Sequence, residues 1–275
     1  MIFEANAYIG QWPFRPLPHA SADGLLRLMD RKGIDKAVVS SSSAIFYRNA
    51  HEGNLELFAA VKGHADRLVP FATINPTYTR WKDDLAECVE KLGMKGLRLH
   101  PYYHGYTPAD GVFAELAAEA VRHGVPLSIS VAMEDQRQRH WLVELPHVDR
   151  SVVVNDHVLQ AMGQTPAATF ILLTVGYSGF SGYEVKRLLA EAPKDVLDGG
   201  RLWFAVSAAV YPPVAERLDL LASVAGQRFV FGSQIPFKYP EPAMLMVNAL
   251  PIDEQGKERV RSGNLLGILG VKHDG

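Results

Sequence analysis

Short apolar runs alternate with longer amphipathic segments along the whole chain. The runs are rich in β-branched and aromatic residues, which is typical of buried strands, and they cover residues 2–9, 36–41, 68–74, 95–100, 127–131, 169–175, 202–208 and 228–232. Helical spacing of apolar residues predicts helices between them, at 25–31, 54–64, 80–92, 112–123, within 149–162, and at 183–192 and 214–225. A helical tail follows at 244–269 and is interrupted near Pro251.

Eight strand–helix units in 275 residues predict an α/β fold. We expect one domain over residues 1–275, a single (β/α)8 TIM barrel with a C-terminal helical extension. An open doubly wound sheet is the main alternative, but no Gly-x-Gly-x-x-Gly follows the first strand, which disfavours dinucleotide binding. The longest irregular stretches, at 11–21, 42–54, 101–111 and 132–150, follow strand ends, where a barrel carries its active-site loops.

Composition and charge exclude several classes of protein. The net charge is -2 and no run of Lys or Arg occurs, so neither nucleic acid nor an anionic membrane is an expected partner. Cys88 is the single cysteine, which excludes an internal disulfide and a thiolate metal site. No apolar stretch approaches the roughly 20 residues that span a bilayer, and no signal-peptide pattern opens the sequence. We therefore expect a cytoplasmic protein.

The strand ends are polar but almost uncharged. Read in chain order, they offer hydroxyl, amide and imidazole groups and one guanidinium: Asn6, Tyr8, Ser40 to Ser43, Asn75, Arg98, His100, Ser130, Thr174, Tyr177, Ser207, Ser233 and Gln234. Few of these side chains are general bases or strong metal ligands. The expected site is therefore a hydrogen-bonding surface more than a charged one.

Several strand ends resemble a known family. The frame Glu4-x-Asn6-x-Tyr8-x-Gly10 resembles the Asp-x-His-x-His-x-Gly start of the amidohydrolase-related barrels, in the branch that includes decarboxylases and lactonases. Residues 231–237, Phe-Gly-Ser-Gln-Ile-Pro-Phe, resemble the closing Phe-Gly-Ser-Asp-x-Pro-Phe of that branch. Residues 33–40, 68–76, 93–101 and 261–270 resemble its second, third and fourth strands and its C-terminal helix. The resemblance covers essentially the whole chain.

The resemblance implies a divalent metal that this chain is not equipped to hold. In the family, two N-terminal histidines bind the metal, histidines after strands five and six assist, and a C-terminal aspartate binds it and takes a proton from water. The corresponding positions here are Asn6 and Tyr8, Ser130, a segment 174–176 without histidine, and Gln234. Zinc prefers His, Cys, Asp or Glu ligands, and a glutamine amide cannot act as a base. We expect no catalytic metal and no other cofactor.

Two histidines and two arginines are candidates for the remaining chemistry. His100 and His104 follow the fourth strand, and a proline directly after His100 argues against a helix that would pair them on a metal. An acid/base or anchoring role suits them better, because neutral histidine titrates near working pH. Arg15 and Arg98 are candidates to hold a substrate carboxylate through bidentate hydrogen bonds.

The loop after the fifth strand is the densest polar cluster. In one interpretation it is a solvated helical face with Glu134 and Arg137 at i, i+3. In the other it covers the barrel mouth, with Asp135 and His140 moving protons and Glu134 and Arg137 binding substrate. The loop resembles a Met-Glu-Asp-x-Arg-x-x-His stretch of a branch that also begins Asp-x-Asn and carries Trp-Pro-Phe-Arg, here residues 12–15. Aromatic residues near these loops either wall a ligand pocket or pack together: Trp12, Phe14, Tyr102, Tyr103 and Tyr106.

Three hypotheses for function stay open. The first is a metal-independent hydrolase or lyase that acts on a small carboxylate, lactone or ring compound, with Asn6, Tyr8 and Gln234 hydrogen-bonded to the substrate. The second is a non-catalytic barrel that binds a small-molecule ligand or partners an active paralogue. The third is a metal enzyme whose ligands the pattern does not reveal. The resemblance also implies a homodimer.

Overall fold

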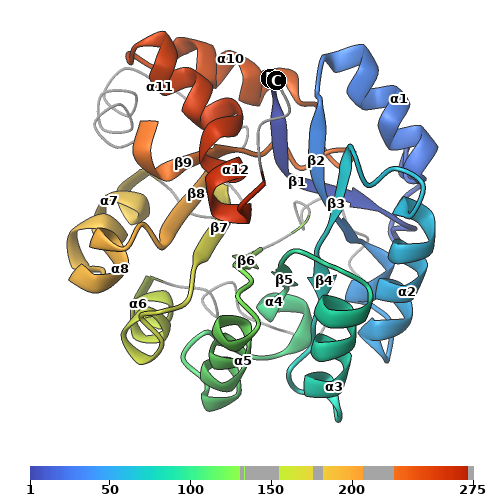
Figure 1. Ribbon diagram of the computed structural model, residues 1–275, viewed down its shortest axis with the longest axis vertical. Coiled ribbons are helices and arrows are strands. Elements are labelled where there is room, and N and C mark those ends of the chain that lie inside the picture. Colours follow the sequence, from blue (N-terminus) through green and yellow to red (C-terminus); the bar gives the residue numbers. More distant parts are fainter. Residues whose placement is uncertain (131–132, 134–154, 176–181, 207–225, 272–275) are drawn as a thin grey trace.

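Parallel strands form the centre of the molecule and helices surround them (Figure 1). The computed structural model describes residues 1–130, 133, 155–175, 182–206 and 226–271. The strands are β1 (Phe3–Ile9), β2 (Lys36–Ser41), β3 (Leu68–Pro70), β4 (Ala72–Thr73), β5 (Leu97–Leu99), β6 (Leu127–Ile129), β7 (Phe170–Val175), β8 (Leu202–Val206) and β9 (Phe229–Phe231). They pair in the orders β1-β2-β3 and β4-β5-β6-β7-β8-β9, and every pair is parallel.

The described strands close into the predicted eight-stranded barrel. β3 and β4 are two parts of one predicted strand, separated by Phe71, whose backbone N–H donates to the carbonyl oxygen of Val39 at 2.9 Å. The ring closes where β1 packs beside β9. There the N–H of Tyr8 donates to the carbonyl of Ile235 at 2.9 Å. The fold class expected from the sequence is confirmed.

The helices mostly follow the predicted segments. Outside the barrel lie α1 (Ala22–Lys32), α2 (Ala50–Val61), α3 (Trp81–Ala86) with its π-helical continuation η2 (Glu87–Lys91), α5 (Gly111–Arg122), α6 (Asn155–Gln164), α7 (Gly182–Glu191) and α8 (Lys194–Asp198). The tail contains α10 (Glu241–Ala249), α11 (Glu254–Glu258), η5 (Arg259–Gly263) and α12 (Asn264–Leu269). Capping residues define the two ends of α1. The Ser21 side chain accepts a hydrogen bond from the N–H of Gly24 at the start, and Gly33 ends the helix in a left-handed conformation at φ 65. The helix predicted at 214–225 lies outside the described residues.

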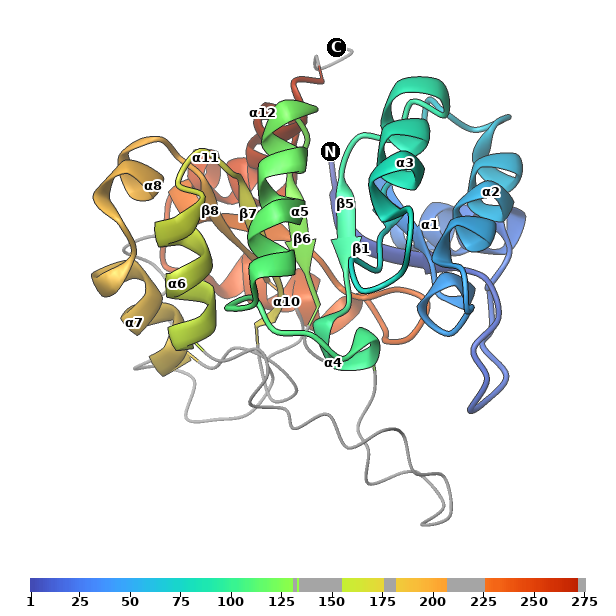
Figure 2. The same ribbon diagram turned by 90° about the horizontal axis from the view of Figure 1, so that it is seen from below.

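Alternate strand residues pack into two different apolar layers, as the two-residue period of a strand requires. Leu97 and Leu99 belong to the layer between strands and helices. Phe3 and Ala5 belong to a second, smaller cluster that also contains Leu265 and Leu266 of α12. This second cluster fills the inside of the barrel. Figure 2 shows α12 and α4 (Pro101–His104) at opposite ends of it.

The helix α4 corrects one expectation. The proline after His100 argued against a helix there, yet α4 begins at Pro101 and the N–H of His104 donates to the carbonyl oxygen of His100 at 3.0 Å. Proline is favourable at the first helical position, because the N–H that it lacks would have no partner there. His100 stays outside the helix as its N-cap and keeps a non-helical conformation.

Within the described residues, no helix has the length and apolar character needed to cross a membrane.

Candidate functional site

The first strand carries a buried carboxyl that joins it to the segment after the last strand. Glu4 is fully buried. Its Oε1 and Oε2 accept the backbone N–H of Ser233 at 2.8 and 2.9 Å, and Oε2 also accepts the Ser233 hydroxyl at 2.5 Å. Its Oε1 accepts the N–H of Asn6 at 2.8 Å. Burial raises the pKa of Glu4 to about 7, although these hydrogen bonds and the Arg98 charge act to lower it.

Sequence reasoning did not include Glu4 among the site residues. The position of Glu4 inside an otherwise apolar strand could have indicated its role, because a carboxylate is rarely buried without a partner.

Arg98 is a fully buried guanidinium on β5. Its Nη1 donates to Asn6 Oδ1 at 3.0 Å, its Nη2 to the carbonyl of Ala5 at 3.0 Å, and its Nε to the hydroxyl of Ser40 at 3.1 Å. The guanidinium carbon lies 5.2 Å from the ring centroid of Tyr8. Among the described residues, no carboxylate forms an ion pair with it. In this structure Arg98 holds the end of β1, and its predicted contact with a substrate carboxylate stays a prediction.

Two amide side chains have one end bonded and the other end free. Asn6 Oδ1 accepts a hydrogen bond from Arg98, and its Nδ2 has no partner among the described residues. Gln234 donates from Nε2 to the carbonyl of Met133 at 2.9 Å, and within the same part of the chain its Oε1 has no partner. Both residues are fully buried. A buried polar group without a partner costs about 1–3 kcal/mol, so the usual partner of such a group is a bound water, an ion or another molecule.

The two histidines lie close together at the end of β5. Their ring centroids are 6.1 Å apart. His100 is fully buried, and neither ring nitrogen has a partner in the part of the chain that the structure describes. His104 contacts the carbonyl of Ile45 through Nε2 at 3.2 Å, while its Nδ1 has no partner among those residues. Burial lowers the pKa of His104 to about 4 and holds the pKa of His100 well below its usual value. Both imidazoles are therefore neutral at pH 7.

The remaining predicted contact at the end of β1 is Tyr8. It is fully buried, and its ring lies 6.2 Å from that of His100 and 5.5 Å edge-on from that of Phe237. Its hydroxyl has no hydrogen-bond partner of good geometry. Burial raises the pKa of Tyr8, which keeps the phenol protonated. The structure thus brings Asn6, Tyr8, Arg98, His100 and Gln234 into one region, and their roles in binding or catalysis stay predictions.

The described residues do not fit the metal that the family resemblance implies. The oxygen of Asn6, at the first expected ligand position, already accepts from Arg98. A divalent ion bound to that oxygen would lie beside a buried positive charge, where the repulsion is poorly screened. Tyr8 stays protonated, and Gln234 offers only a neutral oxygen. No group of three or more His, Cys, Asp or Glu among the described residues could hold a metal ion.

Aromatic side chains pack together over the first strand. The ring centroids of Trp12 and Phe237 are 4.9 Å apart, and Trp12 also contacts Phe14 and Tyr103 at 5.6 and 6.2 Å. Arg15 donates from Nη2 to the carbonyl of Phe237 at 3.2 Å. Of the two roles expected for these aromatic residues, Trp12 and Phe14 pack into a cluster. Arg15 lies at the edge of this cluster, and its role in binding substrate stays a prediction.

A cavity of 280 Å³ opens beside His104. Loops after β2 and β4 and the helix α4 form it, and its lining residues are Ile45, Phe46, Tyr47, Arg48, Asn75, Tyr102, Tyr103 and His104. Arg48 is exposed and forms no ion pair with any described residue. The sequence predicted 42–54 as an active-site loop but did not single out Tyr47 or Arg48. No sequence pattern marks a single arginine in a loop as a binding residue. Only the fold shows that Arg48 lines a cavity together with aromatic residues.

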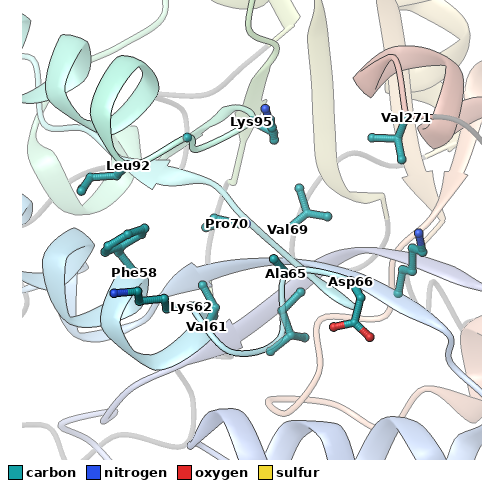
Figure 3. A pocket seen from close by; sticks show the side chains of 13 residues that line it. Phe58, Val61, Lys62, Ala65, Asp66, Val69, Pro70, Leu92, Lys95 and Val271 are labelled. Carbon is teal, nitrogen blue, oxygen red and sulfur yellow. The ribbon is translucent and has the colours of Figure 1, made fainter.

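A second cavity, of 260 Å³, lies where strands begin and so belongs to the other end of the barrel (Figure 3). Its wall is mostly apolar and includes Phe58, Val61 and Val69, with Lys62 and Lys95 among its charged residues. In TIM barrels the reaction takes place at the opposite end, where strands finish. This cavity is therefore not part of the candidate site.

Four predicted site residues lie outside the part of the chain that the structure describes. They belong to the loop after the fifth strand: Glu134, Asp135, Arg137 and His140. Their roles as acid/base and substrate-binding groups stay predictions.

Comparison with known proteins agrees with this architecture. A family model described as amidohydrolase matches residues 5–264. No curated protein matches the sequence. Among solved structures, the 2,6-dihydroxybenzoate decarboxylase from Rhizobium is 17% identical, with a TM-score of 0.72 and coverage of 98% of each chain.

Two further solved structures are similar. A dihydroxybenzoic acid decarboxylase from a Polaromonas species, with bound manganese and 2-nitroresorcinol, is 16% identical with a TM-score of 0.72, over 99% of this chain and 97% of that one. The 4-oxalomesaconate hydratase from Rhodopseudomonas palustris is 16% identical with a TM-score of 0.66, over 98% of this chain and 96% of that one. At these identities the similarity establishes the fold.

Proposed function

The chain belongs to the amidohydrolase family. We propose that it is a lyase or a hydrolase whose substrates are small carboxylate compounds, and that it works without the family's metal ion. The observation that carries this proposal is His104 in the wall of the 280 Å³ cavity, with Nδ1 unpartnered and the His100 ring 6.1 Å away. A pKa of about 4 keeps the His104 imidazole unprotonated and makes it a weaker base than free imidazole, so the proton transfer depends on a substrate group held in hydrogen-bond contact with it.

The same cavity offers recognition for an aromatic carboxylate. The guanidinium of Arg48 matches a carboxylate group through two parallel hydrogen bonds. Phe46, Tyr47 and Tyr103 are among the residues that line the cavity, and aromatic side chains suit contact with a ring. The similar decarboxylases act on hydroxylated benzoates by their names, and this substrate class suits the charge and walls of the cavity. A lactone or another ring compound fits the apolar walls but leaves Arg48 unused.

A decarboxylation would use His104 in both directions. A substrate hydroxyl gives its proton to the neutral imidazole, and the imidazolium delivers that proton to the ring carbon that carries the carboxylate. The C–C bond then breaks, and its electron pair restores the aromatic ring as CO2 leaves and the hydroxyl ends as a phenolate. Asn6, Tyr8 and Gln234 do not line this cavity, so a substrate that they hydrogen-bond would have to enter the barrel more deeply than the cavity reaches. Asp135 and His140 are further proton-transfer candidates from the loop after the fifth strand.

One observation favours a second candidate function. Tyr8, Trp12 and Phe237 pack edge-to-face over the first strand, and the histidines behind the cavity have lowered pKa values. Such a closed, neutral site also suits a barrel that binds a small ligand without catalysis, alone or as the partner of an active paralogue.

The test combines metal content with turnover. Protein purified without chelator is analysed for metals and assayed for CO2 release from a panel of hydroxybenzoates, before and after treatment with EDTA. We expect turnover that EDTA does not remove and no stoichiometric metal. Turnover that requires an added divalent ion would mean that ligands outside the described residues hold a metal, and the metal-free mechanism would be abandoned. Saturable binding without turnover on any panel member would favour the ligand-binding barrel.

A further inference from the structure

We propose that Glu4 and Arg98 act as positioning residues that replace the metal as the centre joining the first strand to the segment after the last one. They orient the amides of Asn6 and Gln234 toward the site. Only the assignment of these two amides to the reaction site rests on the proposed function. In the family pattern the metal connects the positions of residues 6, 8 and 234, and in this chain hydrogen bonds connect the same segments.

The hydrogen bonds form a continuous chain across the barrel. Ser233 donates to Glu4 through both its N–H and its hydroxyl. Glu4 accepts the N–H of Asn6, Asn6 accepts Nη1 of Arg98, and Arg98 donates to Ser40. The segment after β9 is thereby linked to β1, β5 and β2. A metal ion held by residues on several strands would make the same connection.

Arg98 determines which end of the Asn6 amide faces the site. A guanidinium has only donors, so the atom of Asn6 that it contacts must be the oxygen. Asn6 Nδ2 is then left as a buried N–H donor without a partner. The orientation follows from the hydrogen-bond network, which is the ground on which amide orientations are assigned.

Glu4 determines the turn that carries Gln234. Gln234 has φ 67, a left-handed conformation that residues other than glycine rarely adopt. The residue before it, Ser233, is held by three contacts to the Glu4 carboxyl. From this turn, the Gln234 side chain reaches the carbonyl of Met133 and leaves Oε1 free. The two positioning residues thus leave one fixed donor and one fixed acceptor buried inside the barrel.

The experiment observes the two amides directly, so it needs no substrate. Side-chain amide signals of Asn6 and Gln234 are assigned in ¹⁵N–¹H spectra of the full chain by substituting each residue in turn. In E4A we expect both pairs of signals to shift or collapse toward the positions of solvent-exposed amides. In E4Q, whose side-chain oxygen still accepts a hydrogen bond, we expect them to stay close to the original positions.

D253A is the matched control. Asp253 accepts the N–H of Gly256 at 2.7 Å at the start of α11, so its loss removes a comparable bond far from the site and should leave both amides unmoved. A folded E4A protein with unmoved Asn6 and Gln234 signals would overturn the proposal. If E4A does not fold, S233A removes the hydroxyl contact alone, and unmoved Gln234 signals there would overturn it equally.

Metal addition supplies the second readout. We expect Zn²⁺ or Mn²⁺ to leave the Asn6 and Gln234 amide signals of the unmodified protein unchanged, because Arg98 already uses the oxygen of Asn6. Metal-dependent shifts of these signals would overturn the proposal. Absence of turnover on every carboxylate would count against the proposed function and would leave the amide result intact, so the two failures are distinguishable.

Discussion

The interior of the barrel mouth and the cavity at its rim differ in how their polar groups are held. In the interior, Glu4, Asn6 and Arg98 are fully buried, and hydrogen bonds connect Glu4 to Asn6 and Asn6 to Arg98. At the rim, Arg48 is exposed and has no ion-pair partner among the described residues, and Tyr47 is also partly exposed. The interior is therefore suited to holding groups in fixed orientations. The rim is suited to receiving a ligand that arrives from solvent.

The largest expected effect belongs to the residue that lies between the two regions. We predict that His104→Gln lowers turnover by about 10²–10⁴-fold, the usual contribution of a general acid or base, while the unfolding transition changes little. Steady-state kinetics on the best hydroxybenzoate and a thermal melt measure both. Unchanged turnover would remove His104 from the mechanism and direct attention to His100 or to Asp135 and His140.

The interior should respond to substitution mainly through stability. Arg98→Met leaves the acceptors on Asn6, Ala5 and Ser40 without their donor, and we predict that it lowers the free energy of unfolding by about 3 kcal/mol. Urea denaturation followed by circular dichroism measures it. Arg27→Ala, an exposed arginine on α1, is the control and should change stability by less than about 0.5 kcal/mol. Equal effects of the two substitutions would contradict a positioning role for Arg98.

The Glu4 carboxyl predicts a pH dependence of stability with an unusual sign. Its pKa is about 7 in the folded protein and 4.5 in its ordinary state, so between these values the folded protein binds more protons than the unfolded chain. The free energy of unfolding should therefore fall as pH rises from about 4.5 to 7, by about 3 kcal/mol in total. Denaturation at a series of pH values measures the slope. Glu4→Gln should reduce it, and an equal slope in this variant would assign the effect to another group.

The smallest expected effect tests the rim alone. We predict that Arg48→Met raises KM for a carboxylate substrate about tenfold without lowering kcat, because Arg48 pairs with the negative charge of the bound carboxylate and that charge moves into the ring as CO2 leaves. Arg27→Ala again serves as the control. A fall in kcat with unchanged KM would mean that Arg48 stabilises the transition state, and the division between a binding rim and a fixed interior would not hold.

Some of the site could be predicted from the sequence and some could not. Asn6, Tyr8, Arg98, His100 and Gln234 were predicted because parallel strands deliver their C-terminal ends to one face of a barrel. The helix α4 was not predicted, because the rule that disfavours helix before proline does not apply to a helix that starts at the proline itself. Arg48 was not predicted, because a loop residue acquires its neighbours only from the fold.

The sequence by itself determined the barrel and the family. Apolar runs at a regular spacing can be buried only as strands covered by helices, and the residues at their ends keep the order of the family's motifs. Only the tertiary structure decided how the side chains at positions 6 and 234 are hydrogen-bonded. Glu4 and Ser233 lie far apart in the chain, as do Asn6 and Arg98. No local sequence pattern predicts that Glu4 accepts a hydrogen bond from Ser233 or that Arg98 orients the amide of Asn6. Closure of the barrel brings the first and last strands together, and only then do these hydrogen bonds exist.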